Sequence, residues 1–207
     1  TDADIVLVAV KPQAFSRVVP DLQAVAQQQT GLLISIMAGT PLATLEAAVP
    51  DWPVVRAMPN TPATVGAGMT AIAAGRHATE AHLQQARKMF AAVGEVVAVP
   101  ESLINAVTGV SGSGPGYIAL VIEALADGGV AAGLPRATAM QLAIQTVKGT
   151  AELLQTTDMH PAVLKDRVTS PGGTTIAGIA QLEALGLRSA LIEAVQAARD
   201  RADELGT

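Results

Sequence analysis

The first 100 residues alternate between short apolar runs and longer amphipathic stretches. Runs rich in Val, Ile, Leu and Ala predict strands at residues 5–10, 32–36, 54–58, 69–74 and 96–99, and the first of these is expected to be buried on both faces. Amphipathic stretches predict helices between them, at residues 12–29, 42–49 and 81–93, the last ending at Gly94. This alternation predicts an α/β fold with a mostly parallel, doubly wound sheet.

The pattern changes after Pro100, and from Glu101 onward it predicts helices only. Residues 117–132 and 136–154 are apolar on more than one face, so they need to be surrounded by other elements. A partner subunit is the expected cover. The helix expected at Leu187–Leu205 has a single apolar stripe, which is typical of a surface helix. We therefore expect two domains, residues 1–100 and residues 101–207.

Composition and charge exclude several classes of function. The 207 residues include no Cys and carry a net charge of −5 without a basic run, so thiol chemistry, Cys-ligated metals and a nucleic-acid partner are not expected. The apolar runs are shorter than a bilayer span, so no membrane association is expected and a cytoplasmic location is predicted. Aromatic residues make up only 2% of the chain, which favours helices packed through Ala and Gly.

The acid and base residues are too sparse for a hydrolase or a metalloenzyme. His77, His82 and His160 lie in or beside helical segments without a matching carboxylate motif, and each is expected at the surface. No metal site is predicted, because no spacing of His, Asp or Glu matches a known set of metal ligands.

Three successive predicted strands end in residues that suit a ligand site. Ligands of open α/β sheets bind beyond the carboxyl ends of the strands. Lys11 suits a phosphate there, although its position alone is equally typical of a solvated loop. The candidate residues at these ends are Ala9, Val10, Lys11 and Pro12 after the first strand, Ala38 and Gly39 after the second, and Asn60 after the third.

Two glycine-rich segments lie in the helical part. Residues 111–117 (SGSGPGY) match neither a dinucleotide fingerprint nor a nucleophile elbow, and they are interpreted as the entry to a long helix with Pro115 in its first turn. Residues 170–175 (SPGGTT) precede an expected helix, where free N–H groups suit a carboxylate. A plain interhelical turn is an equally good interpretation of that second segment.

Six stretches, taken together and in this order, resemble the pyrroline-5-carboxylate reductase family over essentially the whole chain. They are AVKPQ (9–13), SIMAG (35–39), RAMPNTP (56–62), AVTGVSGSGPGY (106–117), EALADGGVAAGLPR (123–136) and LKDRVTSPGGTT (164–175). The resemblance implies a Rossmann-like domain for NADPH or NADH, followed by an all-helical dimerisation domain that also binds the substrate. It implies a homodimer, or a ring of dimers, that reduces 1-pyrroline-5-carboxylate to proline in proline biosynthesis.

The resemblance also implies the roles of individual residues. Ala9, Val10, Lys11, Pro12, Ala38, Gly39 and Asn60 would bind the nucleotide. Ser170, Gly172, Gly173, Thr174, Thr175 and Glu101 would bind the substrate, with Thr175 as the catalytic residue that orients the ring nitrogen. Arg167 departs from the pattern, because some members have Asn beside the cofactor at that position.

The implied reaction explains why so few acid and base residues are needed. A cyclic imine is basic enough to be protonated, and the iminium accepts hydride without the acid that a ketone requires. Two alternatives remain at this point: a β-hydroxyacid-type dehydrogenase, and a non-catalytic dimerisation module with a decayed nucleotide domain.

One expected feature of the family does not precede the first strand. The glycine-rich pyrophosphate loop belongs to an earlier strand and helix, and no G-x-G-x-x-G stands before Ile5. The sequence therefore predicts a sheet that is incomplete at its N-terminal side, an unpaired edge along residues 5–10, and a natural protein heavier than 21.0 kDa.

Overall fold

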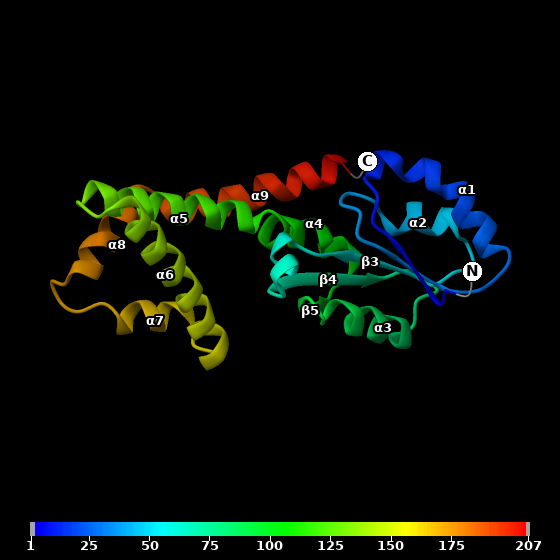
Figure 1. Ribbon diagram of the computed structural model, residues 1–207, viewed down its shortest axis with the longest axis horizontal. Helices are drawn as coiled ribbons and strands as arrows, with labels where there is room; N and C mark the ends of the chain where they lie inside the picture. Colours follow the sequence, from blue (N-terminus) through cyan, green and yellow to red (C-terminus); the bar gives the residue numbers. More distant parts are fainter. Residues whose placement is uncertain (1–2, 206–207) are drawn as a thin grey trace. The chain divides into compact units, whose positions relative to one another are not determined.

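The computed structural model describes residues 3–205 and divides them into two compact units (Figure 1). The first runs to Pro115 and includes the residues from Ala194 onward, and the second is Gly116–Glu193. The first unit contains the sheet, and the second consists of helices.

The sheet has five strands that lie side by side in chain order. They are β1 (Ile5–Val8), β2 (Leu32–Ser35), β3 (Val54–Met58), β4 (Gly68–Ala74) and β5 (Gly94–Ala98). The pairs β1–β2, β2–β3 and β4–β5 are parallel, whereas β3 and β4 are antiparallel. The predicted α/β fold with a mostly parallel sheet is confirmed.

Helices connect the strands and then make up all the regular structure after the sheet. The α-helices are α1 (Phe15–Ala26), α2 (Leu42–Ala48), α3 (Glu80–Phe90), α4 (Ile104–Val107), α5 (Gly114–Ala131), α6 (Arg136–Thr157), α7 (Pro161–Arg167), α8 (Thr174–Ala184) and α9 (Leu187–Leu205). Short 3₁₀ turns occupy Pro12–Ala14, Thr61–Val65 and Glu101–Leu103, and a π turn spans Thr108–Gly112. Within residues 3–205 no single helix is long and apolar enough to cross a membrane, although the bent pair α8 and α9 passes that test by length and composition.

Side chains that alternate along the central strands form two separate cores, one on each face of the sheet. Leu33 and Val54 pack on the face covered by α1 and α2, and that core also includes Ile104 of α4. Ile34 and Val55 pack on the opposite face against Phe90 of α3 and its neighbours. Figure 1 shows α1 and α2 on one side of the sheet and α3 on the other. The continuous apolar runs of β2 and β3 are therefore explained by burial on both faces.

The expectation that the first strand is buried on both faces is wrong. β1 covers only Ile5–Val8, and of its four residues only Val8 is buried, while Leu7 is 46% exposed. The reason is its place in the sheet, because among the described strands β1 pairs only with β2. Within residues 3–205 no strand pairs with the other side of β1.

The helical unit buries few of its apolar side chains. Its core cluster consists of Ala126 on α5 with Ala139 and Ala143 on α6, so small residues make the close contact, as the low aromatic content predicted. Large aliphatic side chains on the same two helices are exposed, including Ile118, Leu120, Leu125, Leu142, Ile144 and Leu153. As the sequence predicted, neither helix finds its cover within the described chain.

Gly94 has a different role from the helix cap that the sequence suggested. Helix α3 ends earlier, with Ala91 as its C-cap in right-handed geometry, and Gly94 is the first residue of β5. Its φ of 149° is unfavourable for other residues, and a Cβ at this position would overlap the backbone of Gly68 on β4. The glycine is therefore required by the close approach of two strands.

Replacing Gly94 by Ala is expected to lower the free energy of unfolding by about 3 kcal/mol, the sum of backbone strain and overpacking. Urea denaturation followed by circular dichroism measures the change. Gly66→Ala is the matched control, because Gly66 has a φ of 73° but open space around it, so only the backbone strain remains. Equal losses for the two variants would contradict the close-approach argument.

Candidate functional site

The carboxyl ends of β1, β2 and β3 meet at one edge of the sheet, because these strands are adjacent and parallel. We call this the carboxyl edge, and define it by the residues that the sequence analysis assigned to the nucleotide: Ala9, Val10, Lys11, Pro12, Ala38, Gly39 and Asn60. The segment after β1 is exposed, and Lys11 is the N-cap of the 3₁₀ turn Pro12–Ala14. The fold thus brings all seven residues to the same edge.

The loop after β2, residues 36–41, has a fixed backbone. Its first amide, that of Ile36, donates to the carbonyl of Val8 at 3.1 Å, and the amide of Met37 donates to the buried hydroxyl of Ser35 at 3.2 Å. Gly39 has a φ of 68°, which a residue with a Cβ rarely adopts. A Cβ there would lie 3.4 Å from the carbonyl oxygen of Leu205 at the end of α9. The loop therefore turns sharply beside α9 and leaves Ala38 exposed.

The side chain of Asn60 joins three segments at the carboxyl edge. Its Oδ1 accepts a hydrogen bond from the amide of Met69 at 2.8 Å, and its Nδ2 donates to the carbonyl of Ser111 at 3.0 Å. Both ends of the amide are thus used within the protein, on the start of β4 and on the π turn. Asn60 therefore has a structural role, because it links the end of β3 to the start of β4 and to the π turn. Any contact with a nucleotide would come in addition.

The chain itself explains why Ser111 needs this donor. In an α-helix the carbonyl of Ser111 would accept from the amide of residue 115, but residue 115 is proline and has no N–H. The helix widens here into the π turn Thr108–Gly112, and Ser113 N donates back to Thr108 O at 2.8 Å. Asn60 supplies the missing donor. The interpretation of residues 111–117 as a helix entry with Pro115 in its first turn is confirmed, and the added π turn was not anticipated.

Glu101, expected near the substrate, makes two hydrogen bonds within the sheet unit. Its Oε1 accepts from Nη1 of Arg56 at 3.1 Å and from the amide of Leu42, the first residue of α2, at 2.5 Å. Arg56 is buried, and its Nη2 also donates to Oδ1 of Asn105 at 3.4 Å. Asn105 in turn donates to Asp203 of α9 at 2.6 Å. Glu101 is therefore one member of a polar chain around a buried guanidinium.

The segment Ser170–Pro171–Gly172–Gly173 forms a tight turn before α8. The amide of Gly173 donates to the carbonyl of Ser170 at 3.0 Å, and Gly172 has a φ of 67° that favours glycine. Gly173 is the N-cap of α8 and has no side chain with which to cap it. The first intrahelical bond is that of Ala177 to Gly173, so the amides of Thr174, Thr175 and Ile176 have no partner within the helix. Such a helix end is suited to a carboxylate.

The remaining substrate candidates share this turn. Thr175 is half-buried at the second position of α8, whereas Ser170 and Thr174 are exposed beside it. A Cβ on Gly173 would overlap the hydroxyl oxygen of Ser170, so glycine lets that hydroxyl lie against the turn. Arg167, the departure from the family pattern, ends α7 and is exposed.

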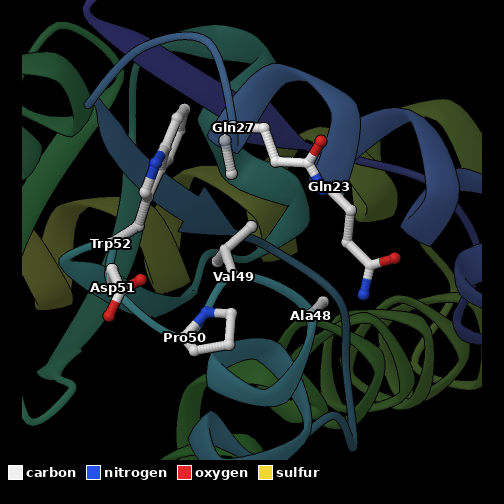
Figure 2. Close-up of a pocket in the computed structure, with 8 residues that line it drawn as sticks. Gln23, Gln27, Ala48, Val49, Pro50, Asp51 and Trp52 are labelled. Carbon is white, nitrogen blue, oxygen red and sulfur yellow. The ribbon is translucent and has the colours of Figure 1, made fainter.

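A separate cavity of about 320 Å³ lies near the amino ends of β2 and β3, at the end of these strands opposite to the carboxyl edge. It is lined by the end of α1 and by the segment between α2 and β3 (Figure 2). Figure 2 shows the Trp52 ring on one side of it and the side chains of Gln23 and Gln27 on the other. None of the candidate residues lines this cavity, so it lies outside the candidate site.

Sequence reasoning missed Arg56 and Asn105 as parts of the site. The signal for Arg56 was present, because a lone arginine within the apolar run of β3 must find a partner. A second signal was Pro115, which lacks an N–H group and so leaves the carbonyl of Ser111, four residues earlier, in need of another donor. Neither signal identifies the partner, since Glu101 and Asn60 lie 45 and 51 residues away along the chain.

The mostly parallel sheet, its loops gathered at the carboxyl edge and the helices that follow it define a Rossmann-like architecture, the class of fold on which dinucleotide-dependent oxidoreductases are built.

A family model described as pyrroline-5-carboxylate reductase dimerisation matches residues 101–205. A pyrroline-5-carboxylate reductase of Synechocystis sp. is 60% identical over 204 residues, which cover 99% of this chain and 76% of the relative. The chain therefore belongs to the pyrroline-5-carboxylate reductase family. Among the alternatives left open by the sequence, this finding favours the reductase over the β-hydroxyacid-type dehydrogenase and the non-catalytic module.

Solved structures agree with this assignment. A pyrroline-5-carboxylate reductase from Coxiella burnetii is 38% identical, with a TM-score of 0.95 over 100% of this chain and 77% of that chain. The pyrroline carboxylate reductase of Plasmodium falciparum, solved with NADP bound, is 32% identical, with a TM-score of 0.90 over 99% of this chain and 78% of that chain.

Asn60→Asp is expected to lower the free energy of unfolding by about 2 kcal/mol, because a carboxylate oxygen would replace the donor that faces the Ser111 carbonyl. The bond from Met69 survives, since Asp keeps the acceptor. Thermal and urea unfolding measure the loss. The control is Gln85→Glu on the exposed face of α3, which makes the same chemical change at the surface and should alter the stability little. A similarly small loss of stability at both positions would exclude a stabilising role for the hydrogen bond from Asn60 to Ser111.

Proposed function

We propose that this chain reduces 1-pyrroline-5-carboxylate to proline with NADPH or NADH, holding the substrate carboxylate at the N-terminus of α8. The observation that carries the site assignment is the open helix end at Gly173, where three successive amides have no intrahelical partner. Family membership supports the reaction, since relatives of this name match nearly the whole chain at up to 60% identity.

The turn before α8 supplies the binding energy for the substrate. The amides of Thr174, Thr175 and Ile176 point out of the helix end, and the helix dipole adds a partial positive charge there. Ser170 and Thr174 are exposed in the same turn, so their hydroxyls are available as further donors. A carboxylate accepts several such bonds at once, so this anchor fixes the orientation of a small ring.

Thr175 is the residue that we assign to the reacting nitrogen. Its hydroxyl can donate to the imine nitrogen or accept from the protonated iminium, so it orients the ring in either state. The nitrogen takes one proton, the adjacent ring carbon takes one hydride, and the C=N double bond becomes a single bond. No strong acid is needed, because the imine is itself basic enough to be protonated.

The carboxyl edge fits the nucleotide. The exposed Lys11 ammonium suits a phosphate, and the turn at Gly39 leaves the backbone beside Ala38 accessible. Ala9, Val10, Pro12 and Asn60 complete the set that would hold the nucleotide at this edge. When bound, the nicotinamide supplies the hydride. The NADP in the Plasmodium falciparum relative supports this assignment.

Residues 101–207 are proposed to form the substrate-binding and dimerisation domain, and residues 1–100 the nucleotide domain. The match of the family model to residues 101–205 supports this division. We propose a homodimer, and a ring of dimers as its higher assembly. The exposed aliphatic side chains of α5 and α6 support association, because isolated chains rarely leave so many uncovered. The cytoplasmic location stays a prediction, which cell fractionation tests.

Thr175→Ala is expected to lower turnover about 10- to 100-fold, the effect of losing one hydrogen bond to a charged or reacting group. NADPH affinity should change little, because the substitution is in the α8 turn. Loss of NADPH absorbance with pyrroline-5-carboxylate measures turnover, and fluorescence titration measures the affinity. Thr157→Ala is the control, since that hydroxyl bonds to Leu153 O within α6. Unchanged turnover in Thr175→Ala would remove the residue from the mechanism.

Leu120→Glu is expected to weaken self-association at least about 100-fold, because a carboxylate would be buried among apolar side chains. Leu120 is 67% exposed and lines a hollow with Met140 and Ile144. Multi-angle light scattering over a concentration series gives the assembly mass and so separates monomer, dimer and ring. The control is Val65→Glu in the sheet unit, where Val65 is 79% exposed. An unchanged mass for Leu120→Glu would place the interface elsewhere.

A further inference from the structure

A buried cation lies behind the carboxyl edge. The side chain of Arg56, on β3, is only 6% exposed, and it forms an ion pair with Glu101 at 3.1 Å. Removing a guanidinium from water is costly unless a carboxylate and further acceptors surround it. Glu101 supplies the carboxylate and Asn105 the second acceptor. The position of Glu101 is therefore determined by Arg56.

The same oxygen of Glu101 also fixes the loop after β2. Glu101 Oε1 accepts the amide of Leu42 at 2.5 Å, and Leu42 directly follows residues 36–41. At the other end of that loop, Ile36 is bonded to Val8 and Met37 to Ser35. The loop that carries Ala38 and Gly39 is thus held at both ends, and Glu101 provides the hold at its C-terminal end.

A third contact ties the end of α9 to this arrangement. Asn105 accepts from Arg56 and donates to Asp203, and the neighbouring Leu205 lies beside Gly39. The polar chain therefore runs from α9 through Asn105, Arg56 and Glu101 to the first amide of α2. Within this chain the carboxylate of Glu101 joins Arg56 of β3 to the residue that follows the loop after β2.

We propose that Glu101 and Arg56 are positioning residues for the nucleotide, because their ion pair holds residues 36–41 in the conformation that binds it. This inference rests on the proposed function in one respect, namely that this loop contacts NADPH or NADH. It assigns Glu101 a role different from the substrate contact that the family resemblance implies. The two groups that donate hydrogen bonds to Glu101 both belong to the sheet unit. One is the guanidinium of Arg56, and the other is the amide of Leu42, the residue directly after the loop.

The chemistry explains why glutamate is needed at this position. A carboxylate oxygen can accept from a main-chain amide and a guanidinium together, and it balances the buried charge. Glutamine keeps an acceptor but loses the charge. Arginine at position 56 is equally specific, because its planar fork reaches Glu101 and Asn105 with two nitrogens, which a lysine ammonium cannot reproduce.

The test measures nucleotide and substrate parameters separately in full-length Glu101→Gln. We expect the KM and the Kd for NADPH to rise about tenfold, the effect of losing one charge-assisted bond. The KM for pyrroline-5-carboxylate, and turnover at saturating NADPH, should change less than about twofold. Arg56→Lys should produce the same split, and it serves as the second variant if Glu101→Gln does not fold. Glu95→Gln, at an exposed carboxylate on β5, is the matched control.

The other outcomes overturn the inference in distinct ways. A rise in the KM for pyrroline-5-carboxylate with unchanged NADPH affinity would make Glu101 a substrate contact. Equal losses in both KM values and in thermal stability, in both variants, would make the pair merely structural. Failure of the proposed function is separate, because it appears in the wild-type protein as NADPH binding without oxidation by pyrroline-5-carboxylate.

Discussion

The buried guanidinium of Arg56 is the constraint on which the arrangement of the carboxyl edge depends. A charge in the middle of an apolar sheet requires a carboxylate, and β1 to β4 place none beside it. The partner comes instead from Glu101, just after β5, and so the chain must return across the end of β3. That return places α4 on the sheet, where Ile104 is completely buried in the core with α1 and α2.

A second constraint acts on the same edge through the backbone. Pro115 removes the donor that Ser111 would use in a regular helix, and Asn60 replaces it from the loop after β3. Gly109 in the π turn lies so close to α9 that a Cβ would come within 2.5 Å of the Val195 carbonyl. The π turn therefore contacts the loop after β3 through Asn60, and α9 through Gly109. Hydrogen bonding of polar groups, and not only burial of apolar side chains, therefore determines how α4 and the π turn lie on the sheet.

The sequence predicted features that depend on local pattern. The strand runs, the change to helices at Glu101 and the glycine turn before α8 all follow from residues within one element. It was wrong about burial of β1, because burial depends on which strands are neighbours. The sequence placed Gly94 at the end of a helix, and this was also wrong. The role of Gly94 depends on its contact with Gly68, which arises only when β4 and β5 pair.

Prediction of the candidate site from the sequence was limited in the same way. The family motifs identified residues that the fold gathers at the carboxyl edge and at the α8 turn. They did not indicate that the Asn60 amide is used twice within the protein, or that Glu101 faces Arg56. Those partners are separated by more than 40 residues along the chain, except for Met69, and no local pattern encodes such pairs.

The scarce histidines show how the chemistry of this chain is divided. His82 accepts the amide of Thr79 at 3.0 Å in a capping box at the start of α3, and His160 accepts the amide of Ala162 at 3.2 Å as the N-cap of α7. Both rings thus use Nδ1 as an acceptor for a helix end, which is a structural role. The charged pair Arg56 and Glu101 is likewise occupied with the fold. An imine that acquires its own proton needs no acid from the protein, so the ionisable side chains are available for capping and positioning.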